Sequence, residues 1–286
     1  MTFLDALKQY RFHLLASLLM LAGLYYGVVP DMVRQWASDD NYSHGFLVPL
    51  ISAFFIYQRW DQLKSAPVKP SGIGLIVVIF GLCQLLLGWL ATEYFNMRLS
   101  LVVLLCGMTL YWFGTRVFTI MALPLLYLAL MIPIPYIIYD AAAFPLKLFV
   151  THASVAALKI MGVVVWNEGN IIMFTNTVLE VADACSGLRS IMSLLALAVA
   201  FAFLTQKSHI KKAIIIASAV PIAVLTNAMR VIVTGVLAQH WGAQVAEGFF
   251  HDFAGFAVFA VAMVLLVVLG GLLSLVGKER SQETDS

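Results

Sequence analysis

Three side chains at the ends of apolar segments have the types needed for acyl transfer: Cys185, Arg230 and His251. A thiolate can attack a carbonyl, an imidazole can exchange the protons, and a guanidinium can stabilise the developing oxyanion. Cys185 comes just before a long apolar run, so we expect it at the N-terminal end of a membrane helix, where backbone N–H groups and the helix dipole favour the reactive thiolate. Arg189 follows four residues later on the same helix face and adds positive charge.

Arg230 and His251 are predicted at the membrane depth of Cys185. Arg230 lies 18 residues after Lys212, which corresponds to roughly 27 Å of helix in a bilayer core of about 30 Å. Asn227 lies one turn before Arg230 on the same face, and His251 opens the next span from the same side. The alternative is that Arg230 extends to the lipid headgroups and His251 is a solvated edge residue.

Two further histidines, His44 and His240, are also predicted on the outer side, and each is an alternative to His251. A metalloprotease would need ligands at characteristic spacings. No His-Glu-x-x-His occurs, and His44, His251 and Asp252 form no such cluster. The sequence therefore predicts neither a metal nor another cofactor.

The composition is that of an integral membrane protein. The 286 residues are 62% hydrophobic and only 11% charged, against about 25% charged in soluble domains. The net charge of +2 comes from scattered basic residues, which does not indicate a nucleic-acid partner. Cys83 and Cys106 lie in apolar runs and are predicted to be packing residues, because three cysteines are too few for a disulfide framework.

The fold class predicted is an all-α polytopic membrane protein with about eight spans. A single membrane-embedded domain would cover residues 1–277, and 278–286 would form a polar cytoplasmic tail. The first apolar run has no convincing cleavage site and is expected to stay as a span. The spans are predicted at 12–29, 45–58, 72–90, 98–113, 117–134, 186–205, 213–236 and 253–276.

The basic residues predict the topology. With the N-terminus in the cytoplasm, that side holds 11 of the 17 Lys and Arg residues, as the positive-inside rule favours. Both termini are then cytoplasmic, and Cys185 is at the outer face.

Residues 140–162 are predicted to form an interfacial helix, because Asp140, Lys147, His152 and Lys159 interrupt its apolar character. If this helix spanned the membrane, Cys185 would move to the cytoplasm. Residues 163–181 alternate turn-forming and β-prone runs, which predicts a small extracytoplasmic β-hairpin before the nucleophile.

The sequence resembles the exosortase/archaeosortase family of membrane transpeptidase-like cysteine enzymes. The motifs that carry the resemblance, in matching order, are Ala184-Cys185-Ser186-Gly187-Leu188-Arg189, Asn227-Ala228-Met229-Arg230-Val231 and His251-Asp252-Phe253-Ala254-Gly255, with the earlier Tyr42-Ser43-His44-Gly45-Phe46-Leu47-Val48.

The resemblance implies a bacterial inner-membrane enzyme that cleaves the C-terminal sorting signals of exported proteins near a Pro-Glu-Pro motif (PEP-CTERM). The cleaved acyl group could then pass to a cell-surface or exopolysaccharide-linked acceptor. It also implies Cys185 as nucleophile, Arg230 as stabiliser and His251 as general acid/base. Arg189, Asn227 and His44 are substrate-binding candidates, and Arg189, Arg34 or Arg98 would meet the acidic residue of the signal.

Two rival classes remain. A polytopic transporter is favoured by the span number and by prolines that break two regions, although the ionisable residues gather at one surface instead of lining a midplane path. A membrane protein of exopolysaccharide assembly is the other. Neither class needs a nucleophilic cysteine.

Overall fold

The structure, a computed structural model, describes residues 1–175, 178–181, 188–241 and 249–282. Two compact units divide the chain, Met1–Pro135 and Tyr136–Ser286. We describe each unit by itself. The prediction of a single membrane-embedded domain over residues 1–277 therefore stays a prediction.

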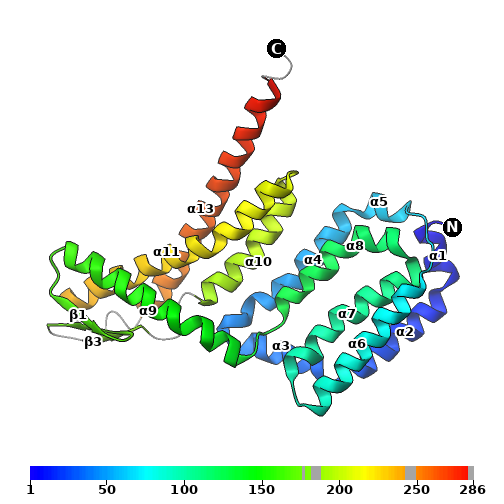
Figure 1. Ribbon diagram of the computed structural model, residues 1–286, viewed down its shortest axis with the longest axis horizontal. Helices are drawn as coiled ribbons and strands as arrows, with labels where there is room; N and C mark the ends of the chain where they lie inside the picture. Colours follow the sequence, from blue (N-terminus) through cyan, green and yellow to red (C-terminus); the bar gives the residue numbers. More distant parts are fainter. Residues whose placement is uncertain (176–177, 182–187, 242–248, 283–286) are drawn as a thin grey trace. The chain divides into compact units, whose positions relative to one another are not determined.

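The first unit is helical throughout (Figure 1). Its α-helices and two 3₁₀ helices are α1 (Phe3–Gln9), α2 (Arg11–Leu24), α3 (Val28–Ser38), η1 (Asp40–Phe46), α4 (Leu47–Gln58), α5 (Trp60–Lys64), α6 (Gly72–Leu90), α7 (Tyr94–Phe113), α8 (Thr115–Tyr127) and η2 (Leu128–Met131). Helices α6 and α7 form the closest pair. A Cβ added at Gly74 of α6 would lie 2.1 Å from the backbone nitrogen of Tyr111 in α7, so the two backbones touch as small residues allow in membrane helices.

The break after α8 has a local cause. Pro124 has no N–H, so the carbonyl of Ile120 loses its helical partner, and Arg59 Nη1 donates to that carbonyl at 2.9 Å. The chain then leaves the α-helix at η2 and is extended at Ile132. Side chains of α3 and η1 donate to the carbonyls of this irregular segment: Trp36 Nε1 to Met131 (2.9 Å) and Tyr42 Oη to Ile134 (3.1 Å). Irregular backbone inside a membrane protein needs such partners.

The second unit contains four long helices and a small sheet (Figure 1). Its elements are α9 (Tyr136–Ile160), β1 (Val165–Glu168), β2 (Ile171–Phe174), β3 (Val178–Glu180), α10 (Leu188–Thr205), α11 (His209–Trp241) and α13 (Phe249–Gln282). The strands form an antiparallel sheet in the order β1-β2-β3. A turn at Gly169, with φ of +59°, joins the first two strands. The predicted hairpin is thus confirmed and gains a third strand.

Two cores hold this unit together. Alanines spaced four residues apart, Ala198 and Ala202 in α10 and Ala219 and Ala223 in α11, pack in one core with Leu266 of α13. Small residues let membrane helices approach closely, and dispersion contacts then stabilise the packing.

The other core joins the sheet to helices α9 and α11. Its buried residues include Leu158 of α9, Ile172 and Phe174 of β2, and Val231 of α11. At Gly235 of α11 an added Cβ would lie 3.0 Å from Phe174. The sheet therefore packs against the C-terminal half of α11. This is the half of the helix that was predicted to lie toward the outer face of the membrane.

The number of spans differs from the predicted eight. Among the described residues, five helices are long and apolar enough to cross a membrane, α6, α7, α9, α11 and residues 253–275 of α13, and a sixth span arises if the bent pair α2 and α3 is counted as one. Three predicted spans are not counted, because α4 has only 12 residues, the α8 segment is broken at η2, and residues 189–205 of α10 form a shorter apolar helix. Helix α9, which was not predicted as a span, is counted instead.

Helix α9 meets these span criteria of length and composition, whereas the charge pattern predicted an interfacial helix over residues 140–162. Its buried face contacts α11 and the sheet, and the interfacial orientation stays a prediction. The prediction that Cys83 is a packing residue is wrong, because its thiol lies on the exposed apolar side of α6, while Cys106 of α7 is buried as predicted.

Candidate functional site

The predicted nucleophile, Cys185, lies outside the described residues, between β3 and α10. The structure does describe the chain on both sides of it. Val181 is 1% exposed, its N–H donates to the carbonyl of Asn170 at 2.9 Å, and Asn170 Nδ2 donates to the carbonyl of Val181 at 3.1 Å. The chain is thus fixed by two hydrogen bonds four residues before Cys185, and α10 begins three residues after it.

Arg230 of α11 packs against Gly255 of α13. A Cβ added at Gly255 would lie 3.5 Å from Nη2 and 3.6 Å from Cζ of the Arg230 guanidinium. A Cβ would therefore be in ordinary contact with the planar guanidinium, whereas a larger side chain would overlap it. The Nε atom of Arg230 is fully buried. Two of the motifs singled out in the sequence, 25 residues apart, therefore meet at one contact between helices.

This contact bears on the choice of histidine. Of His251 the structure describes the backbone, which belongs to the first turn of α13, four positions before Gly255. Positions four apart share one face of a helix, so position 251 lies on the α13 face that meets α11. His240 instead lies on the same helix as Arg230, ten residues further on, or about 15 Å along the axis, and its ring is exposed beside Trp241. The geometry favours His251 over His240.

Asn227 is 1% exposed and lies on the buried face of α11 with Thr226 and Val231. Next to it, the carbonyl of Ala228 accepts a hydrogen bond from Ser154 of α9 at 3.4 Å. Asn227 therefore lies inside the packing between helices and not on an open surface, so a substrate would reach it only from within the unit. Its binding role stays a prediction.

The three arginine candidates for the substrate's acidic group have different surroundings. Arg34 is exposed and forms a salt bridge with Asp31, one turn earlier in α3, at 2.5 Å. Arg98 is 7% exposed and donates to Gln35 at 2.6 Å, which makes it part of the packing between α3 and α7. Arg189 is partly exposed in the first turn of α10, four residues after Cys185. Position therefore favours Arg189.

His44 lies in η1 of the first unit and is 8% exposed. Its Nε2–H donates to the carbonyl of Leu130 at 3.2 Å, in the same irregular segment that Trp36 and Tyr42 hold. Burial lowers the pKa of His44, although the nearby carbonyls of Leu130 and Asn41 oppose the shift. These contacts give the neutral His44 a structural role in the first unit.

Two residues near the predicted site were not assigned a role from the sequence. Gly255 was noted only as part of a motif. Its position four residues after His251 could have predicted that the two share a helix face. Asn170 was taken as a turn residue, and no sequence pattern indicates its cross-strand hydrogen bond to Val181. Within the described ranges, no three His, Cys, Asp or Glu side chains are grouped as a metal site would require.

Comparisons with known proteins bear on the whole arrangement. A family model described as transmembrane exosortase matches residues 36–268, a range that contains every candidate residue discussed above except Arg34. Searches of curated proteins and of solved structures each found no match.

Proposed function

The chain belongs to the transmembrane exosortase family, and we propose that it is a membrane cysteine peptidase or transpeptidase. In this proposal it cleaves the C-terminal sorting signals of exported proteins, near a Pro-Glu-Pro motif, and can pass the acyl group to a cell-surface acceptor. The observation that carries the proposal is the contact of the Arg230 guanidinium with Gly255, one turn from His251. A cation and a general acid/base on adjacent helices are what a cysteine nucleophile requires of its surroundings.

The reaction would begin when the Cys185 thiolate attacks the scissile carbonyl of the substrate. The carbonyl oxygen gains negative charge, and the Arg230 guanidinium would stabilise it with its fork of N–H donors. His251 would then donate a proton to the leaving amine, which gives a thioester and a free amine product. Water or an acceptor nucleophile would release the acyl group from the thioester, with His251 accepting the proton.

Gly255 offers a direct test of this arrangement. Gly255→Leu should lower processing of a co-expressed sorting-signal protein about 100-fold, because a branched side chain would displace the Arg230 guanidinium and small misplacements have costs of that order. Gly255→Ala should be nearly normal, since its Cβ would be at ordinary contact distance. The measurement is the electrophoretic shift of the substrate in membranes with equal amounts of each variant.

Gly271→Leu is the matched control for Gly255→Leu. Gly271 lies in the same helix, and an added Cβ there meets nothing within 4 Å among the described atoms. Normal processing by Gly255→Leu, or an equal loss in both variants, would contradict a role for the Arg230–Gly255 contact.

We also propose that the protein lies in the bacterial inner membrane with both termini in the cytoplasm and Cys185 at the outer face. The charge bias of the sequence supports this orientation. Lys207 lies in the turn between α10 and α11, and Lys211 and Lys212 lie in the first turn of α11. Reporter fusions after Thr177 and after Lys212 should be active outside and inside, respectively. Cytoplasmic activity of the first fusion would overturn the topology.

A further inference from the structure

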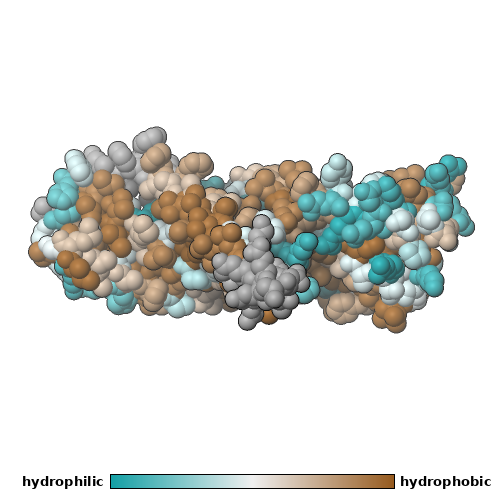
Figure 2. Space-filling view, turned by 90° about the horizontal axis from the view of Figure 1, so that it is seen from above, coloured by the Kyte–Doolittle hydropathy of each residue, from teal (hydrophilic) through white to brown (hydrophobic). Residues whose placement is uncertain are grey.

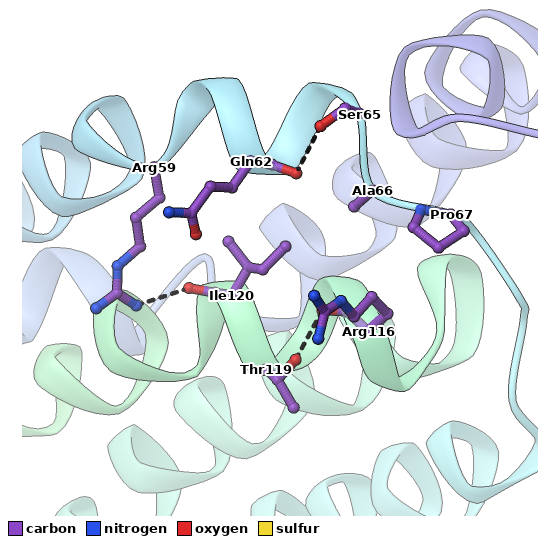
Figure 3. Close-up of a pocket in the computed structure, with 8 residues that line it drawn as sticks. All are labelled: Arg59, Gln62, Ser65, Ala66, Pro67, Arg116, Thr119 and Ile120. Atoms are coloured by element: carbon purple, nitrogen blue, oxygen red, sulfur yellow. Dashed lines mark hydrogen bonds between the residues drawn. The ribbon is translucent and has the colours of Figure 1, made fainter.

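A pocket of about 470 Å³ opens between α5 and α8 of the first unit (Figure 3). Its volume is in the range of small-molecule sites. Gln62 of α5 and Arg59, the residue before that helix, line one side of the pocket. Arg116, Thr119 and Ile120 of α8 line the other. None of the residues proposed for acyl transfer belongs to this lining, so the pocket calls for its own explanation.

The pocket is electropositive. Two of its eight lining residues, Arg59 and Arg116, are cationic and none is acidic. The neighbouring carboxylate of Asp61 is exposed and forms a salt bridge with Lys64 at 2.6 Å, so an adjacent cation already compensates its charge. A ligand of this pocket should therefore be an anion.

Arg116 is exposed at the positive end of a helix, where an anion is favoured. It lies in the first turn of α8, which contains no acidic residue, and the positive end of a helix dipole repels a cation. In the part of the chain that the structure describes, the Arg116 side chain makes no hydrogen bond or ion pair; only its backbone carbonyl is used, by Thr119. An anion in the pocket would offset both the guanidinium charge and the dipole.

Arg59 is better anchored than Arg116. One of its five N–H donors bonds the Ile120 carbonyl at 2.9 Å. This contact holds the guanidinium at the pocket wall (Figure 3). The other N–H donors of the guanidinium are not used by this hydrogen bond. The two arginines thus line the pocket from different segments, Arg59 from the junction of α4 and α5 and Arg116 from α8.

The surroundings place the pocket at the level of lipid headgroups. Tyr57 and Trp60, on either side of Arg59 in sequence, are 75% and 41% exposed, and exposed aromatic residues of this kind mark membrane–water interfaces. The apolar span α6 begins nearby at Gly72. Figure 2 shows hydrophilic residues gathered over the part of this unit that bears α1 and α5.

We propose that this pocket binds the phosphate group of an anionic phospholipid headgroup. Guanidinium groups bind phosphate oxygens in a bidentate manner, and basic pockets between membrane helices are known to hold anionic headgroups. The exposed aromatic residues favour a lipid over a soluble phosphate, because they set the pocket at the depth that headgroups occupy.

The test is thermal unfolding of the purified protein in detergent, titrated with phosphatidylglycerol, phosphatidylcholine or inorganic phosphate. A ligand of the folded state raises the unfolding temperature with concentration. Phosphatidylglycerol should do so. Phosphatidylcholine should do so much less, because its choline ammonium offsets the charge of its phosphate and is repelled by the two arginines. Arg116→Gln should weaken the apparent affinity for phosphatidylglycerol about tenfold, since charge-assisted hydrogen bonds are lost. Lys69→Gln removes the same charge from an exposed position outside the pocket lining and should leave the affinity unchanged.

Arg116→Gln should fold normally, because it removes a cation from the positive end of α8; its unfolding temperature without lipid checks this. Wild-type affinity in Arg116→Gln would overturn the proposal. An equal loss in Lys69→Gln would do so too, because it would indicate general attraction between charges. If inorganic phosphate stabilised the protein equally and abolished the lipid effect, the site would be one for a soluble anion and not for a lipid.

Discussion

Replacement of Cys185 by alanine is expected to abolish processing of a co-expressed sorting-signal protein. Cys185 is the one cysteine of the second unit's sequence, since Cys83 and Cys106 belong to the first unit, in α6 and α7, and a thioester needs a thiol. Cys185→Ser should be nearly as inactive, since a hydroxyl is far harder to ionise than a thiol. The readout is the mobility of the substrate in membranes where each variant accumulates normally.

Cys106→Ala and Cys83→Ala are the controls for the loss of a thiol. Both should process the substrate normally. Mass spectrometry of the wild-type protein, trapped with its substrate, should detect a thioester at Cys185. Normal processing by Cys185→Ala would end the cysteine-enzyme proposal. A transporter would tolerate Cys185→Ala, whereas a cysteine enzyme would not, so this variant distinguishes the two classes of protein.

Arg230→Lys is expected to lower the rate of processing by roughly 10²–10³, the loss seen when one oxyanion donor is removed from a protease. Lysine keeps the positive charge but not the planar fork of donors. The guanidinium packs against Gly255, and the single ammonium group of lysine would not place its donors where the fork of arginine does. If Arg230 acted through charge alone, as in a transporter, Arg230→Lys would retain most of the activity.

His251→Ala provides the complementary measurement, with an expected loss of about 10²–10⁴ from removal of the proton carrier. His240→Ala and His44→Ala are compared in the same assay. His240 is three helical turns from Arg230, and His44 bonds the Leu130 carbonyl, so neither is expected to match the loss in His251→Ala. Normal processing by His251→Ala, with failure of His240→Ala, would move the acid/base role to His240.

The sequence was sufficient for the features that depend on composition and local pattern. Long apolar runs predicted α6, α7, α11 and α13, because the bilayer requires about 20 apolar residues per span. Turn residues between β-prone runs predicted the strands at residues 171–174 and 178–181, which the structure has as β2 and β3. The first strand, β1, includes Asn167 and Glu168, which were predicted to lie in a turn. The family was also evident from the sequence, because the order and spacing of the motifs around Cys185, Arg230 and His251 can be read without the fold.

The tertiary structure decided which of these residues meet. Hydrophobicity alone could not show that the α8 segment ends in η2. Pro124 weakens the helix locally, and the irregular segment after it is held by Trp36, Tyr42 and His44, which bond its carbonyls from about 90 residues earlier in the chain. Nor could hydrophobicity separate His251 from His240. The packing of α13 on α11, where the guanidinium of Arg230 lies against Gly255, favours His251, and its role as the acid/base stays a proposal. A local pattern predicts which residues share a helix face. Which two faces come into contact depends on the packing of side chains from helices that are far apart in the sequence.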